Sequence, residues 1–204
     1  MGFYMVFCLK MGHNTKQFNK SKYIKMKKYC IALLPEENSD NFIALTESFE
    51  EVKKDYALGP NSFPHVTIAQ FFTEETTLDE LWNKIERNID SIVLNLTFNT
   101  FSCITFDNTN FWISLLPTKT EMLHELNSAL NKILNIKLTR PYDPHLTLLS
   151  TKDSSYKEKS REHLNKSISI TDNFTIAIGN CDDLGQFTKI LYKSSPEQSL
   201  SYNL

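Results

Sequence analysis

The sequence lacks the short motifs that mark common metal and nucleotide sites. It contains no HExxH, no Walker-type GxxxxGK[ST], no GxGxxG and no GxSxG. Zincin, P-loop, Rossmann and serine-hydrolase chemistry therefore have no local support. Its four cysteines form no CxxC pair, so the spacing typical of zinc sites is missing as well. Any chemistry must come from other residues.

Long apolar runs are also missing. No stretch approaches the roughly 20 apolar residues of a membrane-spanning helix, and we expect no membrane partner. Cys30 and Cys103 lie in apolar, strand-like runs where buried free thiols are common. Unpaired thiols favour a reducing compartment, so we expect a cytoplasmic protein. A length of 204 residues, 41% hydrophobic and 23% charged, suits one globular domain, and we expect a monomer.

Positive charge is scarce outside the N-terminus. Residues 1–28 carry seven lysines and no acid, whereas the rest carries 15 Lys and Arg (22 − 7) against 24 Asp and Glu. An acidic body argues against a long groove for nucleic acid, which needs clustered cations, but a small nucleotide remains possible. We interpret residues 1–27 as a basic extension, either upstream of a natural start at Met26 or disordered. A nucleic-acid or membrane role for it is the sharper alternative.

The body of the chain repeats one order of elements. A strand ending in LLP occurs at 29–35 and again at 111–117, and each is followed by a helical pattern. PHVTIAQFF (64–72) and PHLTLLS (144–150) then occupy matching places, with His145 80 positions after His65 (145 − 65). We infer a duplicated α+β fold with antiparallel-rich sheets. The predicted domain spans 28–194, with half-repeats at about 28–110 and 111–194 and a tail at 195–204.

Several local details follow from pattern alone. After Ser39, apolar residues at steps of three and four predict a helix that reaches Tyr56. Thr77-x-x-Glu80 matches a capping box. A polar helix is expected at about 154–166. Thr171-Asp172-Asn173 predicts a break in a strand over 167–179.

The two His-x-Thr stretches indicate an active site. Side chains alternate faces along a strand, so His65 and Thr67 should share one face, and His145 and Thr147 another. Two lobes facing one cleft would bring both pairs together. One neutral histidine could then take a proton while the protonated one gives a proton to a leaving oxygen. The threonine hydroxyls could stabilise phosphate oxygens, so the pattern favours phosphodiester chemistry with a bell-shaped pH profile.

Chance must be weighed against this interpretation. Ser and Thr fill 36 of 204 positions, so one of them often follows a histidine by two places. The shared proline before each histidine, and the matching place in each half, raise the signal above that background.

With these stretches the sequence resembles the 2H phosphoesterase superfamily. That superfamily includes LigT-like 2′,5′-RNA ligases, 2′,3′-cyclic nucleotide phosphodiesterases and 2′,5′-oligoadenylate phosphodiesterases. The resemblance covers about residues 28–194 and is specific only in the two motifs. It implies a bilobal fold with helices packed outside, His65 and His145 as the catalytic pair, and Thr67 and Thr147 as phosphate ligands. It also implies no metal and no organic cofactor.

Some neighbouring residues are candidates for substrate contact. Strand alternation places Phe71 on the His65 face and Phe72 on the other, and either could stack a base, although strand aromatics are usually core. Arg140 and Tyr142 precede His145 in a loop that could reach a phosphate or base, or could simply anchor the loop. The remaining histidines, His13, His124 and His163, are expected in solvent.

Three functions remain open at this point. The first is a metal-independent phosphodiesterase acting on small 2′,5′-linked or cyclic nucleotides. The second is a module that binds RNA ends or joins RNA like a 2′,5′-RNA ligase, with the basic head adding affinity. The third is a protein-interaction domain that kept the fold without the chemistry.

Overall fold

The computed structural model describes residues 26–49, 54–89, 93–105, 108–135, 141–156 and 167–195. The expected extension up to residue 25, most of the polar helix (157–166) and the tail from residue 196 lie outside these ranges. The elements in chain order are β1 (Lys27–Pro35), α1 (Ser39–Glu47), β2 (Tyr56–Ala57), β3 (Val66–Thr73), the 3₁₀ turn η1 (Glu75–Thr77), α2 (Leu78–Asn88), β4 (Val93–Ile104), β5 (Phe111–Pro117), α3 (Glu121–Leu134), β6 (Leu146–Thr151), β7 (Ile170–Cys181) and β8 (Phe187–Lys193).

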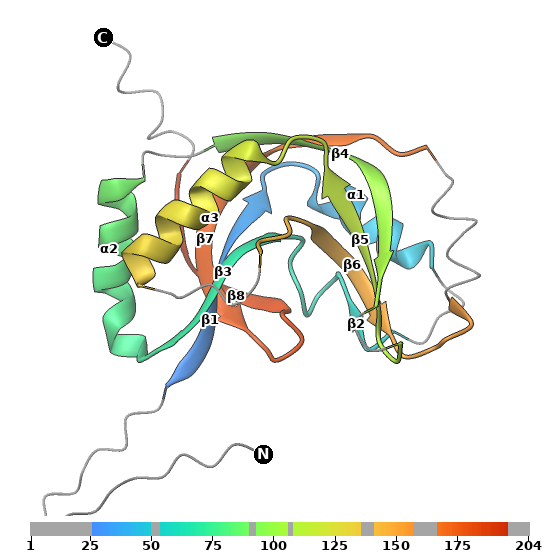
Figure 1. The fold of residues 1–204 in the computed structure, drawn as a ribbon, viewed down its shortest axis with the longest axis horizontal. Coiled ribbons are helices and arrows are strands. Elements are labelled where there is room, and N and C mark those ends of the chain that lie inside the picture. The colour runs from blue at the N-terminus through green and yellow to red at the C-terminus, as the bar shows by residue number, and fades with distance from the viewer. Residues whose placement is uncertain are drawn as a thin grey trace, which may run out of the picture.

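The strands form one connected antiparallel sheet in two lobes (Figure 1). Its order is β1-β3-β6-β5-β4-β7-β8, and β2 pairs with β6. A further pairing between β1 and β7 joins the strands from β1 to β7 in this order into a closed ring. One lobe is β3-β1-β7-β8 and the other is β4-β5-β6-β2. The chain thus has the expected bilobal α+β fold.

A local two-fold relation links the lobes. Each lobe takes its central pair from one half of the chain, β1–β3 or β5–β6, and its next strand from the other half, β7 or β4. Where β4 and β7 pair, residues of the same type lie opposite each other. Asn95 Nδ2 donates to Asn173 Oδ1 (3.0 Å), and the Thr97 and Thr171 hydroxyls are 2.9 Å apart. The half-repeat boundaries themselves stay a prediction.

Both histidine strands contain a bulge at the same place. The β1–β3 register slips past Ile68, and the β5–β6 register slips past Leu148, in each case three residues after the histidine. Because a bulge shifts the alternation of faces by one residue, Phe71 joins Val66 and Ile68 in the core. The predicted placement of Phe71 on the His65 face was therefore wrong.

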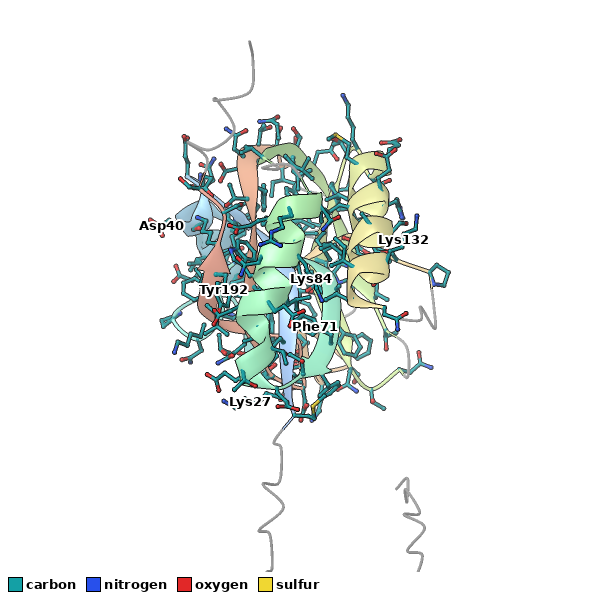
Figure 2. All side chains as sticks on the ribbon, turned by 90° about the vertical axis from the view of Figure 1, so that its left-hand side faces the viewer. Lys27, Asp40, Phe71, Lys84, Lys132 and Tyr192 are labelled. Carbon is teal, nitrogen blue, oxygen red and sulfur yellow. The ribbon has the colours of Figure 1, made fainter. Side chains whose placement is uncertain are left out.

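Helices cover the outer surfaces of the sheet. Phe42 of α1 packs edge-on against Phe98 and Phe174, with ring centroids 5.7 and 6.2 Å apart. Trp82 of α2 stacks on Tyr192 of β8 at 5.7 Å. Figure 2 shows α2 and α3 side by side, with Lys84 and Lys132 on them. In the ranges described, each helix is too short or too polar to cross a bilayer.

Three local expectations were wrong, because tertiary contacts override local propensity. Helix α1 ends at Glu47, and Tyr56 belongs to β2. Thr77 makes no capping box; its hydroxyl donates to the Glu74 carbonyl. Strand β7 runs unbroken through 170–181. Its buried Asp172 accepts the backbone N–H groups of Glu37 and Asn38 (3.1 and 2.7 Å), which fixes the entry to α1.

Gly179 in β7 tests how tightly β8 is seated. A Cβ added there would lie 2.2 Å from the Lys189 carbonyl oxygen and 2.4 Å from the Phe187 ring. We expect Gly179→Ala to lower the free energy of unfolding by about 2 kcal/mol or more, because the obstacle is partly backbone. Urea denaturation measures this, with Thr188→Ala on the exposed face of β8 as control. Equal stability of the two variants would contradict the packing.

Candidate active site

The site lies where the two histidine strands part. β3 and β6 share only the pair Val66–Leu146 and then diverge, leaving a cavity of about 780 Å³. A volume of this size suits a small molecule. The cavity is lined by Tyr56, His65, Thr67, Ile68, Ala69, Gln70, Ile104, Trp112, Ser114, Asn127, Asn131, Pro141, Tyr142, Asp143, His145, Thr147, Asp183, Leu184 and Gly185. All four predicted motif residues therefore meet in one cavity.

The two imidazoles are oriented in the same way. His65 Nδ1 donates to the carbonyl of Phe63, and His145 Nδ1 donates to the carbonyl of Asp143, both at 2.7 Å. A carbonyl oxygen can only accept, so Nδ1 carries the proton in each neutral ring, and Nε2 is the nitrogen that can take up a further proton. The proline between carbonyl and histidine holds this turn because its φ is fixed. The shared Pro-His sequence thus sets the tautomer.

The environments of the two histidines differ. His65 is 5% exposed and packs on the Phe187 ring at 5.5 Å, whereas His145 is half-buried. Burial lowers the pKa of His65; its backbone hydrogen bonds with Phe63 and Gly185 oppose this, and nearby His145 lowers the pKa further. His65 is consequently biased toward the neutral form that can accept a proton.

Each threonine hydroxyl has one nearby donor at the cavity floor. The Cys30 thiol lies 3.7 Å from Thr67 Oγ1, and the Ser114 hydroxyl lies 3.4 Å from Thr147 Oγ1. Both contacts are long, and a hydroxyl rotates readily. Each threonine can therefore turn its proton toward an oxygen bound in the cavity.

Four backbone carbonyls near the point where β3 and β6 diverge accept hydrogen bonds from side chains of the other half of the chain. Tyr142 OH donates to the Thr67 carbonyl (3.1 Å), and Asn127 Nδ2 donates to the Ile68 carbonyl (2.7 Å). In the corresponding set of the second lobe, Tyr56 OH donates to the Thr147 carbonyl (3.4 Å), and Thr46 Oγ1 donates to the Leu148 carbonyl (3.2 Å). We call these four bonds the cross-brace; they bring side-chain donors to backbone carbonyls of the two histidine strands. The Leu148 carbonyl also accepts the backbone N–H of Leu58 (3.0 Å).

The lower-ranked substrate candidates fall in three different places. Tyr142 lines the cavity, but its hydroxyl is engaged in the cross-brace. Phe72 is 65% exposed and does not line the cavity. Arg140 lies outside the described residues. Of the other histidines, the exposed His124 packs edge-on against Tyr142 at 5.4 Å and does not itself line the cavity.

Sequence reasoning missed other cavity residues. Trp112 and Ser114 belong to a strand that was identified only as core, and Tyr56 was assigned to a helix. The repeat could have identified Ser114 as a cavity residue. Ser114 pairs with Thr147 in the second lobe, as Ala32 pairs with Thr67 in the first. Within the part of the chain that the structure describes, no three His, Cys, Asp or Glu side chains gather as a metal site.

Comparison with known proteins points to one family. The model of the 2′-5′ RNA ligase superfamily matches residues 35–177. Escherichia coli LigT without ligand is similar in structure, with a TM-score of 0.56, 14% identity, and coverage of 83% of this chain and 96% of that one. E. coli LigT with 3′-AMP has a TM-score of 0.54 and 15% identity, and the match covers 84% of this chain and 97% of that one. A solved phosphoesterase has a TM-score of 0.51 and 13% identity, and the match covers 83% of this chain and 98% of that one. No curated protein matches significantly.

Titration of His65 tests the burial argument. Its lowered pKa means that the native protein binds fewer protons than the unfolded chain below about pH 6.5, so this group's contribution to stability falls as the pH drops. NMR of labelled histidine should place its midpoint below the usual 6.5. Phe187→Ala, which opens the ring to water, should move the midpoint back up. A wild-type midpoint at or above 6.5 would refute the argument.

Proposed function

The chain belongs to the 2′-5′ RNA ligase superfamily, whose members are 2H phosphoesterases, and on this basis we propose that it is a metal-independent phosphodiesterase. Its substrates would be small 2′,5′-linked or cyclic nucleotides: 2′,3′-cyclic phosphates, 2′,5′-oligoadenylate or cyclic dinucleotides. The observation that carries the proposal is the pair of identically oriented histidines, each with its threonine, in one cavity.

The proposed chemistry is general acid–base catalysis at phosphorus. Neutral His65 accepts through Nε2 a proton from the attacking hydroxyl, which is water or a ribose hydroxyl. The oxygen bonds to phosphorus while the ester bond on the opposite side breaks. Protonated His145 gives its Nε2 proton to the leaving oxygen. We assign the base to His65 because burial disfavours its cation, and the acid role then falls to His145, the other histidine that lines the cavity.

The threonines would act on the phosphate itself. Charge builds on the non-bridging oxygens as the nucleophile arrives, and hydroxyl donors fixed in advance stabilise that charge. Thr67 and Thr147 flank the cavity floor from opposite lobes and can each donate to one oxygen. Removing one such donor costs about 10²–10³-fold in kcat in a comparable site.

The cavity favours a substrate with few phosphates. Among its described lining residues are two aspartates, Asp143 and Asp183, and neither lysine nor arginine. A chain of phosphates would meet carboxylates there without a compensating cation. Similarity to LigT, solved structures of which hold 3′-AMP and NADP+, supports a nucleotide as the ligand.

An alternative function is binding or joining of RNA ends. The description of the matched superfamily and the seven lysines of residues 1–28 favour it. This alternative predicts RNA affinity that falls steeply with salt and is lost when residues 1–25 are deleted.

Turnover in EDTA tests the proposed function. The panel holds 2′,3′-cyclic mononucleotides, 2′,5′-oligoadenylate, mixed-linkage cyclic dinucleotides and 3′,5′-linked controls. We expect one class to be cleaved without metal, and each of His65→Ala and His145→Ala to lower kcat about 10²–10⁴-fold, because each removes one proton-transfer step.

Thr97→Val is the control. Thr97 is a half-buried threonine of β4 that does not line the cavity. The variant should retain full activity. Full activity in either single histidine variant would refute the mechanism. Absence of turnover across the panel would instead favour the RNA-binding alternative or a domain that kept only the fold.

A further inference from the structure

The two lobes differ at one matched position on the cavity side. Cys30 in β1 and Trp112 in β5 occupy equivalent places, each two residues before the residue that pairs with a threonine (Ala32–Thr67 and Ser114–Thr147). Cys30 is fully buried, whereas Trp112 is half-buried and lines the cavity.

Strand β8 accounts for the difference. It extends the first lobe beyond β7, and its Phe187 ring lies over Gly179, the β7 residue directly opposite Cys30. Cys30, Phe187 and their neighbours form a small closed cluster on that side. In the described part of the second lobe, β4 occupies the place of β7 and no strand corresponds to β8. The large aromatic side chain therefore lines the cavity on the side that no described strand beyond β4 covers.

Trp112 is also at a suitable distance from the phosphate site. Ser114 shares its face of β5 and lies 3.4 Å from Thr147 Oγ1 through its hydroxyl. Two residues along a strand span about 7 Å, which is close to the reach of a ribose between its phosphate and its base. Ile104, directly opposite Trp112 on β4, and Pro141 add uncharged surface to the same side of the cavity.

From this geometry we propose that Trp112 is the platform on which the nucleobase of the substrate stacks, on the second lobe beside Thr147 and His145. The proposal rests on the proposed function and adds an orientation to it. The base binds on one side only, because the equivalent position on the first lobe is Cys30, buried beneath β8. A flat aromatic face with uncharged neighbours accepts any base through its π-face. The phosphate is then left between the histidines.

The binding test does not depend on turnover. The chain holds two tryptophans, Trp82 and Trp112, so 5-fluorotryptophan labelling gives two fluorine resonances, and Trp112→Phe identifies one of them. Adding 3′-AMP should shift the Trp112 resonance, while inorganic phosphate and ribose 5-phosphate should leave it in place. The Trp82 resonance, from α2 on the outer surface, is the internal control. A Trp112 resonance that 3′-AMP does not move would overturn the proposal.

The kinetic test separates stacking from chemistry. For the nucleotide that is cleaved, Trp112→Ala should raise KM roughly 10- to 100-fold with kcat little changed, because stacking contributes to ground state and transition state alike. Trp112→Phe should recover most of the loss. Phe72→Ala, an exposed aromatic outside the cavity, should match wild type. On methyl ribofuranoside 2′,3′-cyclic phosphate, which has no base, Trp112→Ala should equal wild type.

These outcomes distinguish the two proposals. Unchanged KM for the nucleotide in Trp112→Ala would overturn stacking while leaving the phosphodiesterase intact. A Trp112 shift with 3′-AMP, in a protein that cleaves nothing in the panel, would support stacking and overturn the proposed chemistry.

Discussion

The histidine-lined cavity depends on one short contact between two strands. β3 and β6 share the pair Val66–Leu146 and no further pair. A fully zipped pair would place the His-x-Thr segments flat in a sheet with no room between them. Divergence opens the cavity, but backbone carbonyls beside it then need other hydrogen-bond donors, because a buried carbonyl without a partner is costly. The cross-brace supplies side-chain donors to these carbonyls from the opposite half of the chain each time, and at Leu148 it adds to the backbone N–H of Leu58.

That exchange ties folding to function. Because each half satisfies the other's bulge and strand edge, neither histidine strand has its native geometry without both halves in place. Strand alternation ahead of each bulge places Val66 and Leu146 in the core and the histidines and threonines on the cavity side. Symmetry places two equivalent imidazoles, and β8 then makes them unequal by burying one side. A site that is symmetric in construction thereby holds one buried and one half-buried histidine, and this difference underlies the base and acid roles that we propose for them.

The sequence predicted the parts that depend on local pattern and repetition. Proline, histidine and threonine recur in matching places, and alternation put His65 with Thr67 and His145 with Thr147 on shared faces, where the structure has them. Alternation failed at Phe71, because a one-residue bulge does not show in the order of residue types. Tyr56 fitted a helical stripe, yet its hydroxyl is used across the cavity. Trp112 lies in the second LLP strand, where the local pattern does not separate a cavity residue from a core aromatic; in the described residues no strand corresponding to β8 covers it. These errors come from long-range pairing, which one sequence does not display.

The pH dependence of kcat/KM on the cleaved nucleotide tests the central claim most directly. A neutral histidine and a protonated one acting together require a bell-shaped profile, whose limbs report the macroscopic titration of the pair in the free enzyme. The account predicts such a bell, with an acidic limb below pH 6.5 because burial lowers the pKa of His65, and loss of that limb in His65→Ala. A wild-type profile with a single limb, or one unchanged by His65→Ala, would contradict the claim that the two histidines share one proton-transfer mechanism.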